Sequence, residues 1–353
     1  MDKHIQELLN GEAASIEYVH AASPEDLSND WYENRYLACV EASLPDNAAL
    51  TDYQLKYISG DAHVDFLKDG CAVCALPDDP VADTSEDLRF AADRMLVRGI
   101  NRFIVPSRFR EDHSKLTAYL QRMAYLFEGG KSVPQAALLH CDEALQAGFA
   151  GDPSETVRQL TASQIDYDIV SSDLFAERRV DLIYNRLVIN GNRYQALIVP
   201  DYACITAPLL GFILAAEETG FPVIFTGQRP SGIVGMDVSD AALALLADTG
   251  TLVEPFAAAA ELISRGIQGI RISPASASIV SYHYRRENHM YLFLNESADQ
   301  DYEGQIYMPG YQEPVIYDAE NNTVRPLSYE RTEKGILANV QIAPRQLLVI
   351  VFG

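Results

Sequence analysis

The periodicity of the sequence changes near Ser278, and this change constrains the fold more than any other feature. Before it, short apolar runs alternate with stretches of helical periodicity, a pattern typical of parallel sheets and barrels. After it, short segments of alternating polar and apolar residues follow one another between turn-forming residues. These segments are SIVSYHYR, HMYLFLN, YEGQIYM, EPVIYD, ILANVQI and QLLVIVFG. The sequence therefore predicts α/β structure followed by an antiparallel β-sandwich of about six or seven strands.

The first 128 residues contain apolar runs that predict strands at residues 16–20, 36–40, 71–76 and 102–105. A helix is predicted over residues 85–97, with Ser85 as its cap and Glu86 and Asp87 in its first turn. The later strands recur about every thirty residues, the length of a βα unit. A closed barrel needs about eight such units. This region is therefore a remnant, an open sheet, or the last part of a barrel whose first half lies elsewhere.

A second α/β pattern follows the glycine-containing linker at residues 128–131. Strands are predicted at residues 136–140, 165–170, 195–199 and 221–226, and a helix over residues 208–219 that ends at Gly220. Strand, helix, glycine and strand in this order favour an open, doubly wound parallel sheet.

The chain has 353 residues. Single cores stop growing at about 250 to 300 residues, so two or three domains are expected.

Three blocks of sequence resemble, in the expected order, parts of large glycoside hydrolases of the α-L-rhamnosidase type. DLRFAADRMLVRGINRFIVPSRF, at residues 87–109, resembles the last helix and eighth strand of the barrel. AYLFEGGKSVPQAALLHCDEALQ, at 124–146, is similar to the junction with a flavodoxin-like domain akin to class I glutamine amidotransferases. HYRRENHMYLFLNES, at 283–297, with EPVIYDAENNTVRPL and APRQLLVIVFG, is similar to the terminal β-sandwich. Residues 1–84 share only the βα rhythm.

The resemblance implies the C-terminal half of a glycoside hydrolase related to rhamnosidases and β-galactosidases. Its domains would be residues 1–128, resembling the last part of a TIM barrel, 129–272, flavodoxin-like, and 273–353, the β-sandwich. It implies a chain that hydrolyses O-glycosidic bonds or frames a site for carbohydrate. The alternative is a noncatalytic carbohydrate-binding or oligomerisation module, which forms a homo-oligomer through the flavodoxin-like domain as in some β-galactosidases. No cofactor is expected.

The chain is strongly acidic, with 50 Asp and Glu against 27 Lys and Arg and a net charge of -23. Such a field repels phosphate backbones and anionic lipid headgroups, so nucleic acid and membrane surfaces are not expected as partners. No stretch reaches the roughly 18 apolar residues of a membrane span, and the N-terminus does not read as a signal peptide. We expect a soluble, cytoplasmic protein, an expectation that a signal peptide upstream would change.

Most glycoside hydrolysis needs two carboxylates at the carboxyl ends of barrel strands. Glu41, after the second predicted strand, is the candidate catalytic residue and Asp78 its candidate partner. His20 and Arg108 follow other strands and are expected to bind substrate. The alternative is that Glu41 is a solvated rim residue and Asp78 part of an acidic loop. If residues 102–105 are the eighth strand, residues 71–76 are the seventh, and no Glu stands at its end. The family's acid/base pair therefore cannot be carried over to this sequence. This departure argues for a noncatalytic chain or an incomplete one.

Five cysteines, at positions 39, 71, 74, 141 and 204, are too scattered for a disulfide framework, and no zinc-ligand spacing is present. We expect them to be reduced and no metal to be bound. A flavodoxin-like domain raises the option of an amidotransferase with Cys204 as nucleophile and His283 or His289 as base. The sequence disfavours it, because Cys204 lies five residues beyond the strand that ends at Val199 and not in a sharp elbow.

The predicted β-sandwich is rich in tyrosine, and aromatic faces bind the C–H faces of sugars. Tyr307 and Tyr311, which flank Met308, Pro309 and Gly310, are the candidate carbohydrate-binding pair. The alternative is that the tyrosines of this region pack in the core or at its rim, because period-two alternation is also what a sandwich core requires.

Overall fold

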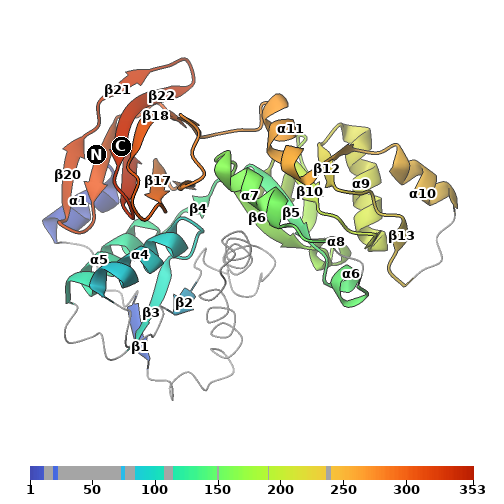
Figure 1. The fold of residues 1–353 in the computed structure, drawn as a ribbon, viewed down its shortest axis with the longest axis horizontal. Helices are drawn as coiled ribbons and strands as arrows, with labels where there is room; N and C mark the ends of the chain where they lie inside the picture. Colours follow the sequence, from blue (N-terminus) through green and yellow to red (C-terminus); the bar gives the residue numbers. More distant parts are fainter. Residues whose placement is uncertain are drawn as a thin grey trace. The chain divides into compact units, whose positions relative to one another are not determined.

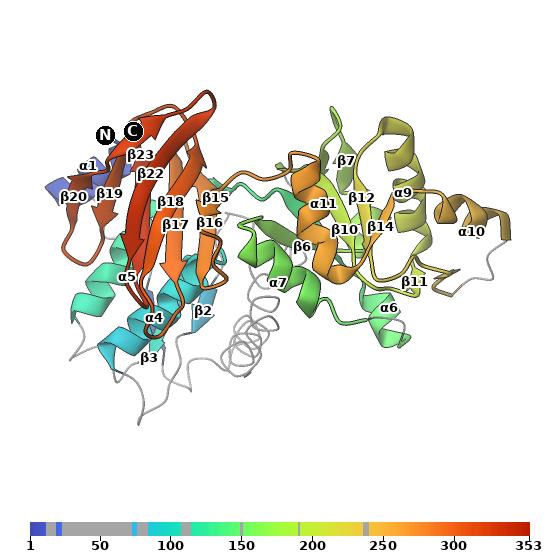
Figure 2. The same cartoon turned by 45° about the horizontal axis from the view of Figure 1, so that its top comes forward.

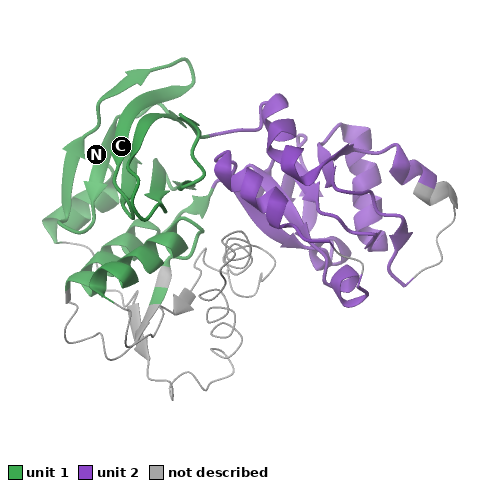
Figure 3. Ribbon diagram, in the orientation of Figure 1, with its two compact units in different colours: residues 1–59, 65–132, 270–353 green, residues 60–64, 133–269 purple. Residues whose placement is uncertain are grey.

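The computed structural model describes residues 1–11, 19–22, 73–75, 84–106, 114–148, 151–189, 191–235 and 240–353. The chain is a mixture of helices with parallel and antiparallel sheets, as the sequence predicted. It divides into two compact units (Figure 3). Among the described residues, unit 1 holds 1–132 and 270–353, and unit 2 holds Val133–Gly269. The three domain ranges inferred from the sequence stay a prediction.

Unit 1 contains two antiparallel sheets (Figure 1). The four-stranded sheet has the order β15 (Arg271–Ser273), β18 (Tyr302–Pro309), β22 (Gly335–Ile342) and β21 (Tyr329–Arg331). The six-stranded sheet has the order β20 (Thr323–Pro326), β19 (Pro314–Asp318), β23 (Leu347–Phe352), β17 (His289–Asn295), β16 (Ile279–Arg285) and β4 (Lys131–Ser132). All six strand segments that the sequence predicted after Ser278 are present. Lys131, predicted as the last residue of the linker, lies in β4, which pairs with β16 with Ser132 opposite Tyr284.

The six-stranded sheet is buried on both faces. In β23, Leu348, Ile350 and Phe352 join the core shared with the four-stranded sheet. Val349 and Val351 point the other way, into a core shared with the helices α1 (Lys3–Asn10), α4 (Ser85–Leu96) and α5 (Ser114–Leu126). A strand buried on both faces needs apolar residues at consecutive positions, which explains the uninterrupted run LLVIVF.

Caps and ion pairs hold the helices of unit 1 in place. Helix α4 begins at a capping box in which Thr84, and not the predicted Ser85, is the cap and exchanges hydrogen bonds with Asp87. The fully buried Arg98, just after α4, places its Nη1 2.8 Å from Oε1 of Glu296. Burial alone would raise the pKa of Glu296, but the charges of Arg98 and Arg94 outweigh it and the pKa is lowered. The carboxylate thus ties α4 to the end of β17.

A small parallel sheet completes the described part of unit 1. Its order is β1 (Val19–Ala22), β3 (Arg102–Pro106) and β2 (Val73–Ala75), with Val19 opposite Phe103. These strands correspond to three of the runs predicted near the N-terminus, and the fourth, at residues 36–40, lies outside the described residues. Strand β3 stands between helices α4 and α5 in the chain, as a βα unit requires.

Unit 2 is built on a five-stranded parallel sheet (Figure 2). Its order is β6 (Tyr167–Ser171), β5 (Ala136–His140), β10 (Ala196–Val199), β12 (Val223–Thr226) and β14 (Thr251–Val253). The helical segments are α6 (Asp142–Gln146), α7 (Ser154–Ala162), α8 (Asp173–Ala176), α9 (Ala207–Thr219), α10 (Asp240–Ala247), η4 (Pro255–Ala257) and α11 (Ala258–Ser264). Two smaller sheets contain β7 (Val180–Leu182), β8 (Leu187–Ile189) and β9 (Asn192–Tyr194), and β11 (Cys204–Ile205) with β13 (Gly232–Ile233).

The parallel sheet is also covered on both faces. Leu197 and Val199 of β10 share a core with Leu209 and Ile213 of α9. Ile198, which points to the other face, is fully buried as well. Helix α9 ends where predicted, at Gly220, whose φ of 71° is left-handed and favours glycine. The order of the strands reverses between β5 and β10, which makes this the topological switch point.

Candidate functional site

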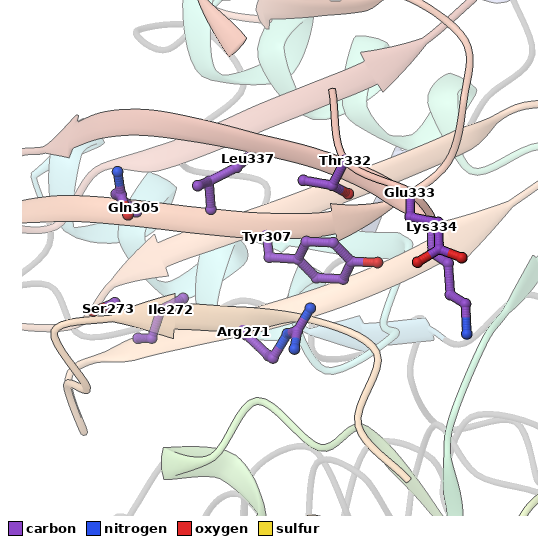
Figure 4. Close-up of a pocket in the computed structure, with 9 residues that line it drawn as sticks. All are labelled: Arg271, Ile272, Ser273, Gln305, Tyr307, Thr332, Glu333, Lys334 and Leu337. Atoms are coloured by element: carbon purple, nitrogen blue, oxygen red, sulfur yellow. The ribbon is translucent and has the colours of Figure 1, made fainter. Parts of the chain in front are cut away.

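An open groove of about 470 Å³ lies on the outer face of the four-stranded sheet (Figure 4). It contains Tyr307, one of the two tyrosines selected from the sequence. The residues that line it are Arg271, Ile272, Ser273, Gln305, Tyr307, Thr332, Glu333, Lys334 and Leu337. All of them belong to unit 1.

Strand register brings the groove residues together. Arg271 of β15 stands opposite Tyr307 of β18, which in turn stands opposite Leu337 of β22. The next row on the same face joins Gln305 to Ser273 and Asn339. Side chains alternate between faces, so Ile306 and Ala338 between these rows point to the core. Ile272, in the edge strand β15, packs partly against that core and also borders the groove.

Sequence reasoning missed Arg271, Lys334, Gln305 and Asn339. The period-two spacing of Gln305 and Tyr307 was a readable signal that these two share a face. No sequence signal places Arg271 beside them, because that neighbour relation depends on the pairing of β15 with β18.

The Arg271 guanidinium lies over the ring of Tyr307, with its central carbon 4.0 Å from the ring centroid. This cation–π contact occupies one face of the ring, so that face is not free to stack on a sugar. No carboxylate among the described residues forms an ion pair with Arg271, and none of its N–H groups has a hydrogen-bond partner there. Its in-plane donors are therefore available to a ligand.

Tyr311 lies next to the groove and does not line it. Its hydroxyl donates to the backbone oxygen of Glu333 at 3.4 Å, and its own carbonyl accepts from Nη1 of Arg331 at 2.6 Å. Its ring is 64% exposed. Tyr311 thus supports the turn that carries Glu333 and Lys334 and presents a free aromatic surface beside it.

Amide groups extend the polar surface along the sheet. Nε2 of Gln305 donates to Oδ1 of Asn339 at 3.2 Å. Each amide keeps further donors or acceptors, because an amide side chain has two N–H groups and a carbonyl oxygen. Glu333 is the one carboxylate that lines the groove. Hydrolysis normally needs two carboxylates across the bond, so the described residues that line the groove do not supply a catalytic pair.

The candidate catalytic residues Glu41 and Asp78 lie outside the described residues, as does Arg108. His20 lies in β1, opposite Ile104 of β3, where only the backbone is described. Their roles stay a prediction.

The amidotransferase alternative gains no support from the described residues. Cys204 lies in β11 of unit 2, with its sulfur against Gly232. His283 and His289 belong to unit 1, where Nε2 of His283 and Nδ1 of His289 are 2.8 Å apart. Burial, with the charges of His289 and Arg285, lowers the pKa of His283 to about 3. The two histidines are hydrogen-bonded to each other, His283 being buried and His289 half-buried.

The carboxyl ends of β5 and β6 carry a second polar cluster, which the sequence did not reveal. Oε2 of Glu143 accepts from Oγ of Ser172 at 2.7 Å and from the Cys141 thiol at 3.5 Å. Cys141 is fully buried, and burial raises the pKa of its thiol. The Glu143 carboxylate thus joins the segments that follow β5 and β6.

Within the described ranges, no three His, Cys, Asp or Glu side chains gather as they would around a metal ion. None of the helices described is both long and apolar enough to cross a bilayer.

Neither a protein-family model nor a curated protein matches this sequence. Solved structures of glycoside hydrolases do match the fold. A rhamnosidase from Novosphingobium sp. PP1Y is 14% identical over 85% of this chain, with a TM-score of 0.67. A β-galactosidase from Bacillus circulans sp. alkalophilus is 8% identical over 86%, with a TM-score of 0.57. A β-galactosidase from Rahnella sp. R3 is 10% identical over 94%, with a TM-score of 0.55.

The chain spans only part of these enzymes. It corresponds to 33% of the rhamnosidase and to 58% and 60% of the two β-galactosidases. At such identities the likeness is one of fold alone. The chain therefore has a glycoside hydrolase-like fold, in agreement with the resemblance found in the sequence.

Proposed function

We propose that this chain is the counterpart of the C-terminal half of a large glycoside hydrolase and that it binds carbohydrate in the groove around Tyr307. The observation that carries the proposal is the fold likeness to a rhamnosidase over 85% of the chain. The groove adds a surface of suitable chemistry, since it combines an aromatic ring, amides, hydroxyls and cations on one open sheet face.

Three features support the finer architecture. In chain order, the parallel sheet of unit 2 runs second, first, third, fourth, fifth, the strand order of flavodoxin. The two antiparallel sheets share one core, as the sheets of a β-sandwich do. Strand β3 pairs in parallel with both β1 and β2, as neighbouring strands of a TIM barrel do.

Binding is tested by titration calorimetry of the full chain against a broad panel of oligosaccharides, followed by the Tyr307→Ala variant. We expect this variant to bind about tenfold more weakly, because it removes the ring on which Arg271 rests. Tyr184→Ala, which removes a 94% exposed ring in unit 2, is the matched control and should bind normally. Equal affinity of Tyr307→Ala and the unaltered chain would contradict the groove as the binding surface.

Hydrolysis by Glu41 and Asp78 is a separate part of the proposal. If it operates, at least one aryl glycoside of a broad panel is cleaved, and Glu41→Gln or Asp78→Asn abolishes the cleavage. Carbohydrate binding without turnover across the panel would favour a noncatalytic chain.

Assembly through unit 2 is a second candidate function, and its sheet edge favours it. Strand β14 is at the edge of the parallel sheet. Leu252 in β14 is 45% exposed, Phe256 in η4 63% and Ile263 in α11 41%. An exposed strand edge with apolar neighbours is a common site of association. Sedimentation velocity should show an oligomer that Phe256→Glu weakens, whereas a monomer at all concentrations would exclude this role.

A further inference from the structure

We propose that the groove around Tyr307 selects acidic saccharides, those that carry a carboxylate or a sulfate ester. This inference rests on the proposed carbohydrate-binding function and adds the class of sugar. It is carried by the two cations that line the groove, Arg271 and Lys334.

The Arg271 guanidinium is held in place by a ring contact that uses none of its hydrogen-bond donors. Its central carbon lies 4.0 Å from the centroid of the Tyr307 ring, and the ring contact restricts the orientation of the side chain. The donors of a guanidinium lie in its plane and form a fork that fits the two oxygens of a carboxylate or sulfate. An arginine that faces a groove with unused donors favours an oxyanion over a neutral hydroxyl.

Lys334 supplies a second cation on the turn between β21 and β22. No described carboxylate lies within ion-pairing distance of its ammonium group, although the neighbouring Glu333 also lines the groove. In a chain whose net charge is -23, a groove lined by two cations and one carboxylate has a local excess of positive charge. Figure 4 shows the Tyr307 hydroxyl directed toward the side of the groove formed by Glu333 and Lys334.

The net negative charge does not prevent such binding. At physiological salt the Debye length is about 8 Å, so exposed carboxylates farther away are largely screened. Groups that line the groove act at contact distance and are screened much less. The Glu333 carboxylate repels an acidic ligand. Removing its charge should therefore strengthen binding, whereas removing the charge of Arg271 or Lys334 should weaken it.

The experiment compares oligosaccharides that differ only in charge, by titration calorimetry of the full chain at about 0.15 M salt. One arm sets an oligouronate against its methyl ester, and another sets a sulfated oligosaccharide against its desulfated form. We expect the acidic member of at least one arm to bind at least tenfold more tightly, and the arms distinguish uronate from sulfate ester. Either arm supports the proposal.

Variants then locate the effect. We expect Arg271→Gln to weaken acidic binding about tenfold and Lys334→Gln about threefold, as charge-assisted and exposed ionic contacts do. Glu333→Gln should strengthen it about twofold, because it removes a like charge. Arg193→Gln, which removes an exposed positive charge of unit 2, is the matched control and should change nothing. Thermal midpoints of all variants check the fold.

The possible failures separate the two proposals. If neutral and acidic partners bind equally and Tyr307→Ala weakens both, the preference for acidic sugars is overturned and the carbohydrate-binding function stands. If no saccharide binds, or if binding ignores every groove variant, both are overturned. If polyglutamate binds as tightly as the acidic saccharide, the groove recognises charge alone and the saccharide assignment is overturned.

Discussion

The two antiparallel sheets of unit 1 differ in pattern as well as in surroundings, since consecutive residues are buried in β17 and β23 whereas buried and exposed residues alternate in β18 and β22. The six-stranded sheet is covered by helices on one face and by the other sheet on its second face. The four-stranded sheet is covered on one face only, and its outer face carries Arg271, Gln305 and Tyr307. The exposed face of the four-stranded sheet therefore offers a binding surface. The difference predicts that substitutions in the first sheet affect stability and substitutions on the outer face of the second affect binding.

The largest effect is expected where the doubly covered sheet loses a large side chain. Phe352 is fully buried and packs against Tyr291, with ring centroids 5.5 Å apart. Phe352→Ala should lower the free energy of unfolding by about 3 to 5 kcal/mol, through lost burial and the cavity left behind. Urea denaturation measures it. A loss below about 1 kcal/mol would show that this core is loosely packed.

A similar or slightly smaller loss is expected from Glu296→Gln. This change leaves the buried Arg98, and Arg94 beside it, without their shared carboxylate. Removing one partner of a buried ion pair typically costs about 3 kcal/mol or more. Arg271→Gln removes an exposed charge of the open sheet face and is the matched control, with an expected change within about 0.5 kcal/mol. Equal losses of unfolding free energy in the two variants would contradict the expected difference between the two sheets.

The lowered pKa of the buried His283 makes the free energy of unfolding depend on pH. The pKa of His283 is lowered by burial from 6.5 to about 3 in the folded state. Below about pH 6.5 the unfolded chain takes up a proton that the folded chain does not, so stability falls as the pH falls toward 3. The slope is at most about 1.4 kcal/mol per pH unit for this group.

The buried Asp93 has the opposite effect on the pH dependence of the free energy of unfolding. Burial raises its pKa from 3.8 to about 7, so the folded state binds the extra proton and stability rises as the pH falls from 7 toward 4. His283→Phe keeps an aromatic ring beside Tyr291 and removes only the histidine contribution. Its urea midpoint should fall less between pH 6.5 and pH 4 than that of the unaltered chain, and parallel pH profiles would contradict the assignment.

The smallest effect on stability is expected on the outer face of the four-stranded sheet. Asn339→Ala removes one hydrogen bond, the one from Gln305, at an exposed position. The free energy of unfolding should change by no more than about 0.5 kcal/mol, measured by urea denaturation. A loss of several kcal/mol would mean that this face is a structural element and not an open binding surface.

Local sequence determined much of this protein. The six alternating segments after Ser278, the helix before Val97 and the end of α9 at Gly220 follow from periodicity, capping and the conformational freedom of glycine, which act within a few residues. The glycoside hydrolase-like fold was also readable, because blocks of sequence resemble those enzymes in the right order. The roles of Glu41, Asp78, His20 and Arg108 remain predictions.

Tertiary structure alone decided which faces are covered and which residues meet. Ile5 near the N-terminus and Val349 near the C-terminus share one core, and Arg271 meets Tyr307 only because β15 pairs with β18 in one register. Such contacts join residues that are far apart in the chain, so they depend on the pairing of whole elements and not on local preference. The pairing of whole elements therefore left one sheet covered on both faces and gave the other an exposed face that carries the groove around Tyr307.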